Sequence, residues 1–392
     1  MALIGFAYSK KAQGSSSEIF KILLFTIIPV FLIGPIAGAY VDRWDRRRTL
    51  YVCDFLRMAL VFILPVFLFY IKNLSIAYIL IFVIFCVARF FLPAKLSIVP
   101  DLVERKHLLI ANSLVNITGM IAFIVGSGVS GVLVEYVGAE KGFYLDGLSF
   151  FISATLIYLI AKKPSAVVNL RKVSEDIVEV IKKSVIQEIK EGTLYFITQR
   201  NIRLTAAILF VVSSALGVIS VVSIVFVQNA LHSSTKYLGL LIMFLGAGLF
   251  LGSLVYGRFG QRLSYYRTIF TSLILTGAMI VCFALGLKQY PYFIPAALLS
   301  LGLGFVASPI LIASNTIIHK SSDNQMRGKI FSSLEIVMHL GFLLFMYISS
   351  ILAERFSHVS MLVTIGCVFC VLGAVSLAWQ RKIPWLDKIG RE

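Results

Sequence analysis

Among the ionisable side chains within the long apolar runs of this sequence, five stand out by their spacing or depth. Asp54 and Arg57 are three residues apart, a spacing at which side chains meet on one helix face and form an ion pair. Glu335 and His339 are four apart, and a Glu–His face is able to titrate near neutral pH. Arg89 lies about ten residues from the nearest run end. A charge inside an apolar run requires a partner or a function, so all five are candidates for substrate binding or ion coupling, and Asp54 and Arg57 also for support of a contact at the inner end of their run. Structural pairing is the alternative for both pairs.

No enzyme chemistry accompanies these charges. The sequence has no clustered nucleophile, no set of metal ligands and no paired carboxylates, so we expect no catalytic residue, metal or cofactor. It also lacks the GxxxxGK[ST] loop that cradles nucleotide phosphates. ATP hydrolysis by this chain is therefore not expected, and an ion gradient is the expected energy source.

The composition identifies the elements that must position these residues. Hydrophobic residues make up 59% of the chain and charged residues 14%, whereas soluble domains carry about 25% charged residues. With so few charges, 392 residues could not cover a water-exposed surface, which indicates an all-α membrane protein. The net charge of +17 comes from basic residues in short loops, so we attribute it to membrane topology and expect no nucleic-acid partner.

Apolar runs of about 20 residues, long enough to cross a bilayer, occur eleven times. They lie near residues 18–41, 50–71, 75–98, 111–137, 143–161, 203–228, 236–257, 267–287, 291–318, 330–353 and 358–379. Residues 1–8 are apolar but too few to span, and a polar stretch follows them. We interpret them as the outer end of a truncated first helix, which gives eleven full transmembrane helices plus a stump.

Basic residues predict the orientation. If the loop at 42–50 is cytoplasmic, the cytoplasmic segments hold 25 Lys and Arg and the outer segments hold eight. Positive charge favours the cytoplasmic side. We therefore predict a multi-pass protein of the inner (plasma) membrane with a cytoplasmic C-terminus, and we expect it to be a monomer in the lipid bilayer.

An internal repeat divides the chain. The segment 34–50 aligns without gaps on 253–269, an offset of 219 residues, and shares a glycine, a basic residue and a closing Arg-Thr-aliphatic triplet. Two similar halves in the same orientation indicate a parallel duplication. We predict an N-terminal half at 1–161, an amphipathic cytoplasmic linker at 162–202, a C-terminal half at 203–379 and a cytoplasmic tail at 380–392.

The loop after the first long run has the chemistry of a latch between these halves. Gly34 and Gly38 are four apart and allow a close helix approach, and the Asp42 carboxylate is suited to the positive N-terminus of a helix from the other half. Three arginines that follow are suited to carboxylates or lipid phosphates: Arg43, Arg46 and Arg47. We predict that this loop holds the halves together on the cytoplasmic side, the alternative being that the arginines only fix topology.

These residues resemble a known family. The pattern Gly34-x3-Gly38-x3-Asp42-Arg43-x2-Arg46-Arg47 resembles the loop 2–3 signature of the major facilitator superfamily. The run from Asp42 to Leu50, Asp54-Phe-Leu-Arg57 and Leu92-Pro-Ala-Lys95 are similar to its macrolide-efflux and enterobactin-exporter branch. The resemblance implies the major facilitator fold, with two six-helix halves. It also assigns proton coupling to Arg89, although the glycine-rich context of that arginine is missing, and helix bending to Gly119, Gly126 and Gly131 in a fifth helix that resembles that of antiporters.

The resulting hypothesis is a secondary active transporter that exports amphiphilic small molecules of the drug, macrolide or siderophore type. Alternating access and proton coupling are implied by the resemblance. Two alternatives stay open: a lysophospholipid or lipid flippase of the same fold, and a transport-inactive membrane partner protein.

Overall fold

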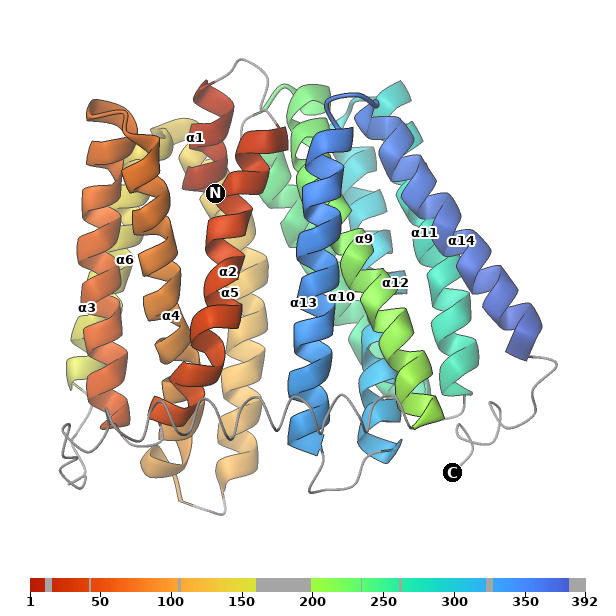
Figure 1. Cartoon of the computed structure of the whole chain (residues 1–392), viewed down its shortest axis with the longest axis horizontal. Helices are drawn as coiled ribbons and strands as arrows, with labels where there is room; N and C mark the ends of the chain where they lie inside the picture. The colour runs from red at the N-terminus through yellow and green to blue at the C-terminus, as the bar shows by residue number, and fades with distance from the viewer. Residues whose placement is uncertain are drawn as a thin grey trace.

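The computed structural model describes residues 1–10, 16–41, 44–104, 107–159, 199–233, 235–260, 263–321 and 327–380. Within these ranges every regular element is helical (Figure 1). The first set of helices is α1 (Ala2–Lys10), α2 (Ser16–Val41), α3 (Arg46–Pro65) with its π-helical extension η1 (Val66–Tyr70), α4 (Leu74–Leu102), α5 (Leu108–Val137) and α6 (Ala139–Leu159). The second set is α9 (Arg200–Leu231), α10 (Lys236–Phe259), α11 (Tyr265–Gln289), α12 (Phe293–Ser321), α13 (Arg327–Leu352) and α14 (His358–Gln380).

Eleven of these helices are long and apolar enough to cross a membrane. This confirms the eleven spans predicted from the sequence, and α1, with nine residues, occupies the position of the predicted stump. The predicted linker at 162–202 lies almost entirely outside the described residues, as does the tail after Gln380.

Helix starts follow the offset of the sequence repeat. Four helices of the second set, α11 to α14, each begin 219 residues after their counterparts α3 to α6. The starts of α3 to α6 are Arg46, Leu74, Leu108 and Ala139. Those of α11 to α14 are Tyr265, Phe293, Arg327 and His358. On the same offset α1 corresponds to the last part of α9. Figure 1 shows the two sets side by side, with α1–α6 on the left and α9–α14 on the right.

The two ends of the bundle carry different connections. We refer to the end where α2 ends and α3 begins as the predicted cytoplasmic end, which is the lower end in Figure 1. The opposite end, where α1 is followed by α2 and α13 by α14, is the predicted outer end. These names carry over the topology predicted from the positive charges.

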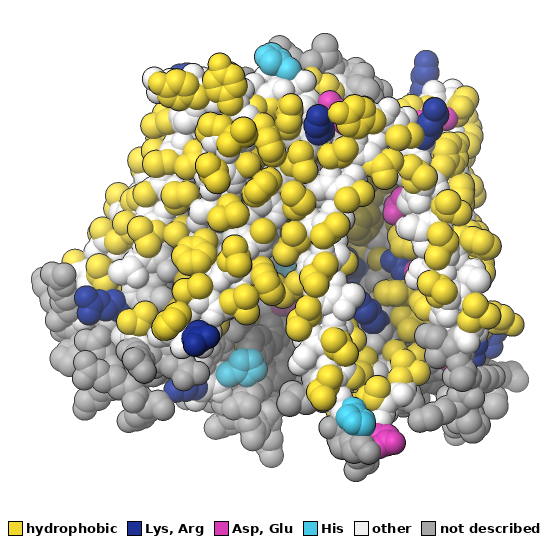
Figure 2. Space-filling model, turned by 180° about the vertical axis from the view of Figure 1, so that it is seen from behind, with side chains coloured by type: hydrophobic (Ala, Val, Ile, Leu, Met, Phe, Trp, Pro, Cys, Tyr) yellow, Lys and Arg dark blue, Asp and Glu magenta, His cyan; other side chains and the backbone are white. Residues whose placement is uncertain are grey.

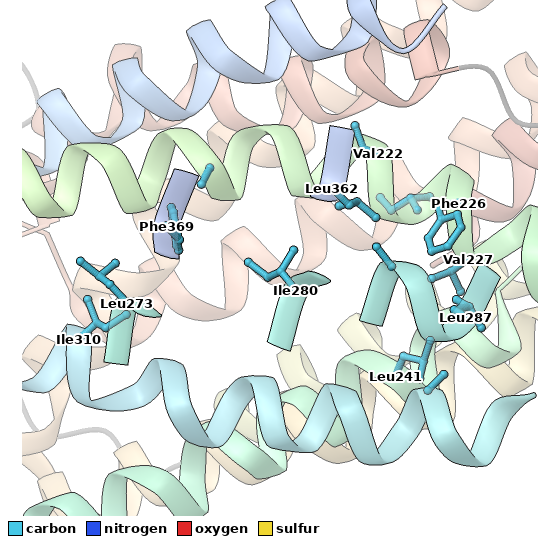
Figure 3. Close-up of a cluster of buried hydrophobic side chains, with 14 of the residues drawn as sticks. Val222, Phe226, Val227, Leu241, Leu273, Ile280, Leu287, Ile310, Leu362 and Phe369 are labelled. Atoms are coloured by element: carbon cyan, nitrogen blue, oxygen red, sulfur yellow. The ribbon is translucent and has the colours of Figure 1, made fainter. Parts of the chain in front are cut away.

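The largest buried cluster lies in the second half (Figure 3), where α9, α10, α11, α12 and α14 contribute apolar side chains such as Phe226, Leu241 and Ile280. Ile19 and Ile22 of α2 belong to the same cluster, so the outer part of the first half packs against the second. A smaller cluster joins α1, α3, α4 and α6 within the first half. The apolar contacts of Ile19 and Ile22 with the second half hold the two sets of helices together near their outer ends.

Candidate transport cavity and its gates

The two halves make their closest contact where α5 meets α10. An added Cβ atom on Gly131 would lie 2.8 Å from the Cα atom of Gly239, and one on Gly239 would lie 2.8 Å from the Cα atom of Gly131. Only glycine fits both positions, because real Cβ atoms do not approach backbone so closely. The contact continues toward mid-depth, where Gly128 faces Met243 and Gly246 faces Ile124.

This contact gives one of the fifth-helix glycines a packing role. Helix α5 runs from Leu108 to Val137, and bending at Gly119, Gly126 and Gly131 stays a prediction. Gly131 allows the close approach of α10. A Cβ atom on Gly119 or Gly126 would meet no described atom within 4 Å.

A carboxylate seals the outer end of the same seam. Glu135 of α5 accepts hydrogen bonds from the main-chain N–H groups of Thr235 at 2.8 Å and Lys236 at 3.3 Å, at the N-terminus of α10. The Thr235 hydroxyl donates to the Gly131 carbonyl at 2.9 Å. The free N–H groups and the positive dipole at a helix N-terminus both favour an anion, so Glu135 links the halves as an inter-helix cap.

The sequence interpretation missed this link. Glu135 stands near the end of an apolar run, and an acidic residue in such a run is the signal that the sequence offers. Its partner is 100 residues away, too far for any local pattern to identify.

On the other side of the molecule α2 approaches α13, also toward the outer end. The rings of Phe20 and Tyr347 lie 5.4 Å apart between centroids, and the Ser16 hydroxyl is 3.4 Å from Nε2 of His358 on α14. Aromatic rings therefore separate α2 from α13, in contrast to the glycine contact between α5 and α10. Both seams hold the halves together at the predicted outer end.

At the predicted cytoplasmic end, the predicted latch residues behave differently. A Cβ atom on Gly34 would meet no described atom within 4 Å, so the close approach expected there is absent from this conformation. Arg46 donates to the Ser97 carbonyl of α4 at 2.9 Å, and Arg47 donates to the carbonyls of Ile157, at 3.2 Å, and Tyr158 in the last turn of α6. The last-turn carbonyls of α6 lack helical donors and attract guanidinium groups.

These bonds join α3 to α4 and α6 within the first half. Asp42 and Arg43 lie outside the described residues, and Gly38 falls within α2. The latch between the halves stays a prediction for a conformation in which the cytoplasmic ends meet.

Asp54 and Arg57 form the ion pair expected from their spacing, with the Ser153 hydroxyl donating to the second Asp54 oxygen at 2.6 Å. The Arg57 guanidinium lies over the rings of Phe91 and Phe150, 4.4 and 4.5 Å from their centroids. The Asp54 side chain is 1% exposed, so the pair cross-links α3, α4 and α6 inside the first half. This environment favours the structural pairing that the spacing of the two residues allowed.

Arg89 faces the other half. It lies on α4 within electrostatic range of Glu335 on α13, and its Nε atom is buried without a described hydrogen-bond partner. Glu335 is exposed, and Nδ1 of His339 lies 2.7 Å from the Glu335 carbonyl oxygen. Two of the predicted coupling residues, Arg89 of the first half and Glu335 of the second, thus lie within electrostatic range of each other across the space between the halves.

A cavity of about 370 Å³ opens beside this space, below the α5–α10 seam. Its lining comes from α4, α5 and α10: Leu92, Lys95, Leu96, Val115, Asn116, Gly119, Met120, Phe123, Ile124, Gly246 and Leu249. Figure 2 shows a cleft on the face seen from behind, in which Lys and Arg side chains are visible between apolar walls. Contact at the outer end and a cavity toward the other end give a pathway closed on one side.

The family model described as transmembrane secretion effector matches residues 13–389, nearly the whole chain. The chain belongs to this family of major facilitator transporters. It is 24% identical over 376 residues to the MFS-type transporter YfiS of Bacillus subtilis (strain 168), covering 94% of this chain and 86% of that one. It is 25% identical over 331 residues to the multidrug efflux pump Tap of Mycolicibacterium fortuitum, covering 81% and 76%. To macrolide efflux protein A of Streptococcus pyogenes it is 22% identical over 358 residues, covering 89% and 84%.

Solved structures of transporters share the fold of this family member. A mutant of the peptide transporter POT has a TM-score of 0.72 at 16% identity, covering 99% of this chain and 91% of that one. The nucleoside transporter NupG has a TM-score of 0.68 at 12% identity, covering 96% and 92%. The family makes the protein a multi-pass membrane transporter, as predicted, and the solved structures show its fold.

Proposed function

We propose that this transporter is a secondary active exporter of amphiphilic small molecules, of the drug, macrolide or siderophore type, that works by alternating access and is coupled to protons. The observation that carries the proposal is the asymmetry of the pathway. The halves are joined at the predicted outer end by Gly131, Gly239 and Glu135, while the cavity lies toward the predicted cytoplasmic end. An exporter loads its substrate in such a state.

Proton coupling is supported by the charges between the halves. Arg89, Glu335 and His339 lie within the membrane-spanning helices, where an ionisable group has a functional role by default. A carboxylate that gains and loses a proton beside a fixed guanidinium changes the attraction between α4 and α13. Proton binding from the outer side would thereby favour one arrangement of the halves over the other.

Two relatives named for efflux, the multidrug pump and the macrolide efflux protein, support export over uptake. We place the protein in the inner (plasma) membrane with its C-terminus in the cytoplasm, as a monomer, in line with the distribution of basic loops. A lysophospholipid flippase is the second candidate, favoured by the cleft between apolar walls in Figure 2.

Transport into inside-out vesicles tests the proposal. Vesicles that contain the full chain receive an acidic lumen by dilution, together with one of three fluorescent amphiphiles that are cationic, neutral or anionic. We expect at least one to accumulate, and an uncoupler to abolish the accumulation. Equal accumulation in vesicles without the protein would contradict export, and movement of only a fluorescent lysophosphatidylcholine, whose zwitterionic head carries no net charge, would favour the flippase.

A further inference from the structure

The cavity between α4, α5 and α10 has a polar end and an apolar end. At 1.5 Å per residue, Lys95 lies about 10 Å from the predicted cytoplasmic end of α4, and Asn116 about 12 Å from that end of α5. Ile124 lies about 24 Å from the same end of α5, beside Gly246. The ammonium and the amide therefore face the cytoplasmic side, and the apolar wall rises toward the middle of the bilayer.

Lys95 differs from three arginines of the first half that have protein partners. Arg46 and Arg47 bind main-chain carbonyls, and Arg57 binds Asp54. No hydrogen bond or ion pair joins Lys95 to another described residue, although it is partly buried on the cavity wall. An ammonium at this depth without a described partner is suited to the anionic group of a ligand.

The apolar part of the cavity has room for a chain. Gly119 contributes no side chain, and a Cβ atom there would meet no described atom within 4 Å. Met120, Phe123 and Leu92 line the adjacent wall. The distance from Asn116 to Ile124 is about 12 Å along α5, shorter than one leaflet of a hydrocarbon core of about 30 Å. The cavity volume lies in the range of sites for one small ligand.

We propose that this cavity binds a single-chain amphiphile with an anionic head, a carboxylate or a phosphate. The head lies between Lys95 and Asn116, and the tail extends along Gly119 and Phe123 toward Gly246. This assignment names the substrate class of the proposed exporter and rests on that function. A ligand oriented in this way enters from the cytoplasmic leaflet without turning over, because its head and tail already have the depths that they have in the membrane.

Photolabelling of the purified full-length protein tests the assignment without requiring transport. The probe is decanoic acid with a diazirine at the end of its tail, and mass spectrometry locates the adducts. We expect adducts on the peptides that contain Phe123 and Gly246. An excess of dodecyl phosphate should suppress them, whereas dodecyltrimethylammonium and the two-chain dioleoyl phosphatidate should not. Equal suppression by the cation would overturn the anionic site, and equal suppression by the phosphatidate would overturn the single-chain site.

Variants locate the head group. Lys95→Gln should lower labelling about tenfold, the effect of losing one charge-assisted hydrogen bond, and Lys95→Arg should keep it. Lys288→Gln, which removes an exposed lysine at the outer end of α11, is the matched control. The competition experiment on the unmodified protein decides the question even if Lys95→Gln fails to fold. If vesicle transport fails while this pattern is found, the binding site stands and the exporter proposal falls; the reverse result leaves an exporter with another substrate class.

Discussion

The Glu135 carboxylate on α5 caps the N-terminus of α10 through the N–H group of Thr235, at 2.8 Å, and so joins the two halves of the protein at the predicted outer end. The same physical interaction, an acidic side chain against a helix N-terminus of the other half, was predicted for Asp42 at the opposite end. A transporter that opens alternately to the two sides of the membrane needs one such contact at each end. The Glu135 contact at the outer end and the predicted Asp42 contact at the cytoplasmic end would then form alternately.

Loss of the Glu135 cap should loosen the outer contact. Removing a helix cap costs about 1 kcal/mol, so we expect Glu135→Ala to raise the population open to the outside about fivefold. The measurement is the rate at which a membrane-impermeant maleimide labels Phe20→Cys, at the α2–α13 contact, after replacement of the five native cysteines.

Glu354→Ala is the matched control for this variant. Glu354 occupies the position equivalent to Glu135 on the 219-residue offset, and it is exposed near the outer end of α13. Labelling rates that rise equally in the two variants would show that Glu135 holds no gate.

The α5–α10 contact predicts a difference between two glycines of one helix. Gly131→Ala forces the helices apart and should destabilise the protein by about 1–3 kcal/mol. Gly126→Ala meets open space and should be neutral or stabilise by about 0.5–1 kcal/mol, because alanine favours the helix. Thermal unfolding in detergent measures both, and a midpoint for Gly131→Ala at or above that of Gly126→Ala would refute the contact.

Substitutions in the Asp54–Arg57 pair should lower the stability of the fold. Arg57→Met leaves Asp54 buried with only Ser153 as a partner, and removal of one member of a buried pair costs about 3–5 kcal/mol. The double variant Asp54→Leu, Arg57→Met should recover most of the loss, since no buried charge then remains. The readouts are the yield of monodisperse protein and its unfolding temperature, and a double variant no more stable than the single one speaks against this role.

Arg89 and Glu335 should act on transport instead. Neither belongs to a buried cluster, so Arg89→Gln and Glu335→Gln should keep the unfolding temperature within a few degrees. Both should abolish accumulation of the amphiphile that the wild type concentrates in response to an acidic lumen. Proton movement recorded with an entrapped pH dye gives the second readout, and unchanged proton-driven transport in Glu335→Gln would exclude that carboxylate from coupling.

Whether a feature could be predicted from the sequence depends on how far apart its interacting residues lie along the chain. Hydropathy is a local property, so the spans, the helix starts near Leu74 and Leu108, and the Asp54–Arg57 pair could be predicted from the sequence. Helix partners depend on tertiary packing, and the bonds from Arg47 to Ile157 and from Thr235 to Glu135 cross about 100 residues. No periodicity encodes such contacts.

The cavity residues show a second limit. Lys95 and Asn116 were visible only as part of a family motif and of an apolar run, because a cavity is formed by the space between helices. A glycine that bends a helix and one that admits a neighbouring helix look alike in a sequence, so the sequence could not show that Gly131 packs against α10. The position of Gly239 opposite it shows this contact.

The central expectation is that contacts between the halves form at the cytoplasmic end as those at the outer end break. Distances between spin labels measure this change directly. One label pair, Leu114→Cys on α5 and Leu254→Cys on α10, reports on the predicted cytoplasmic end, and the other, Ile71→Cys and Tyr290→Cys, on the outer end. With a transported amphiphile at acidic pH in nanodiscs, we expect the cytoplasmic distance to shorten and the outer distance to lengthen. Two distances that stay fixed under these conditions, or that change in the same direction, would contradict alternating access by this protein.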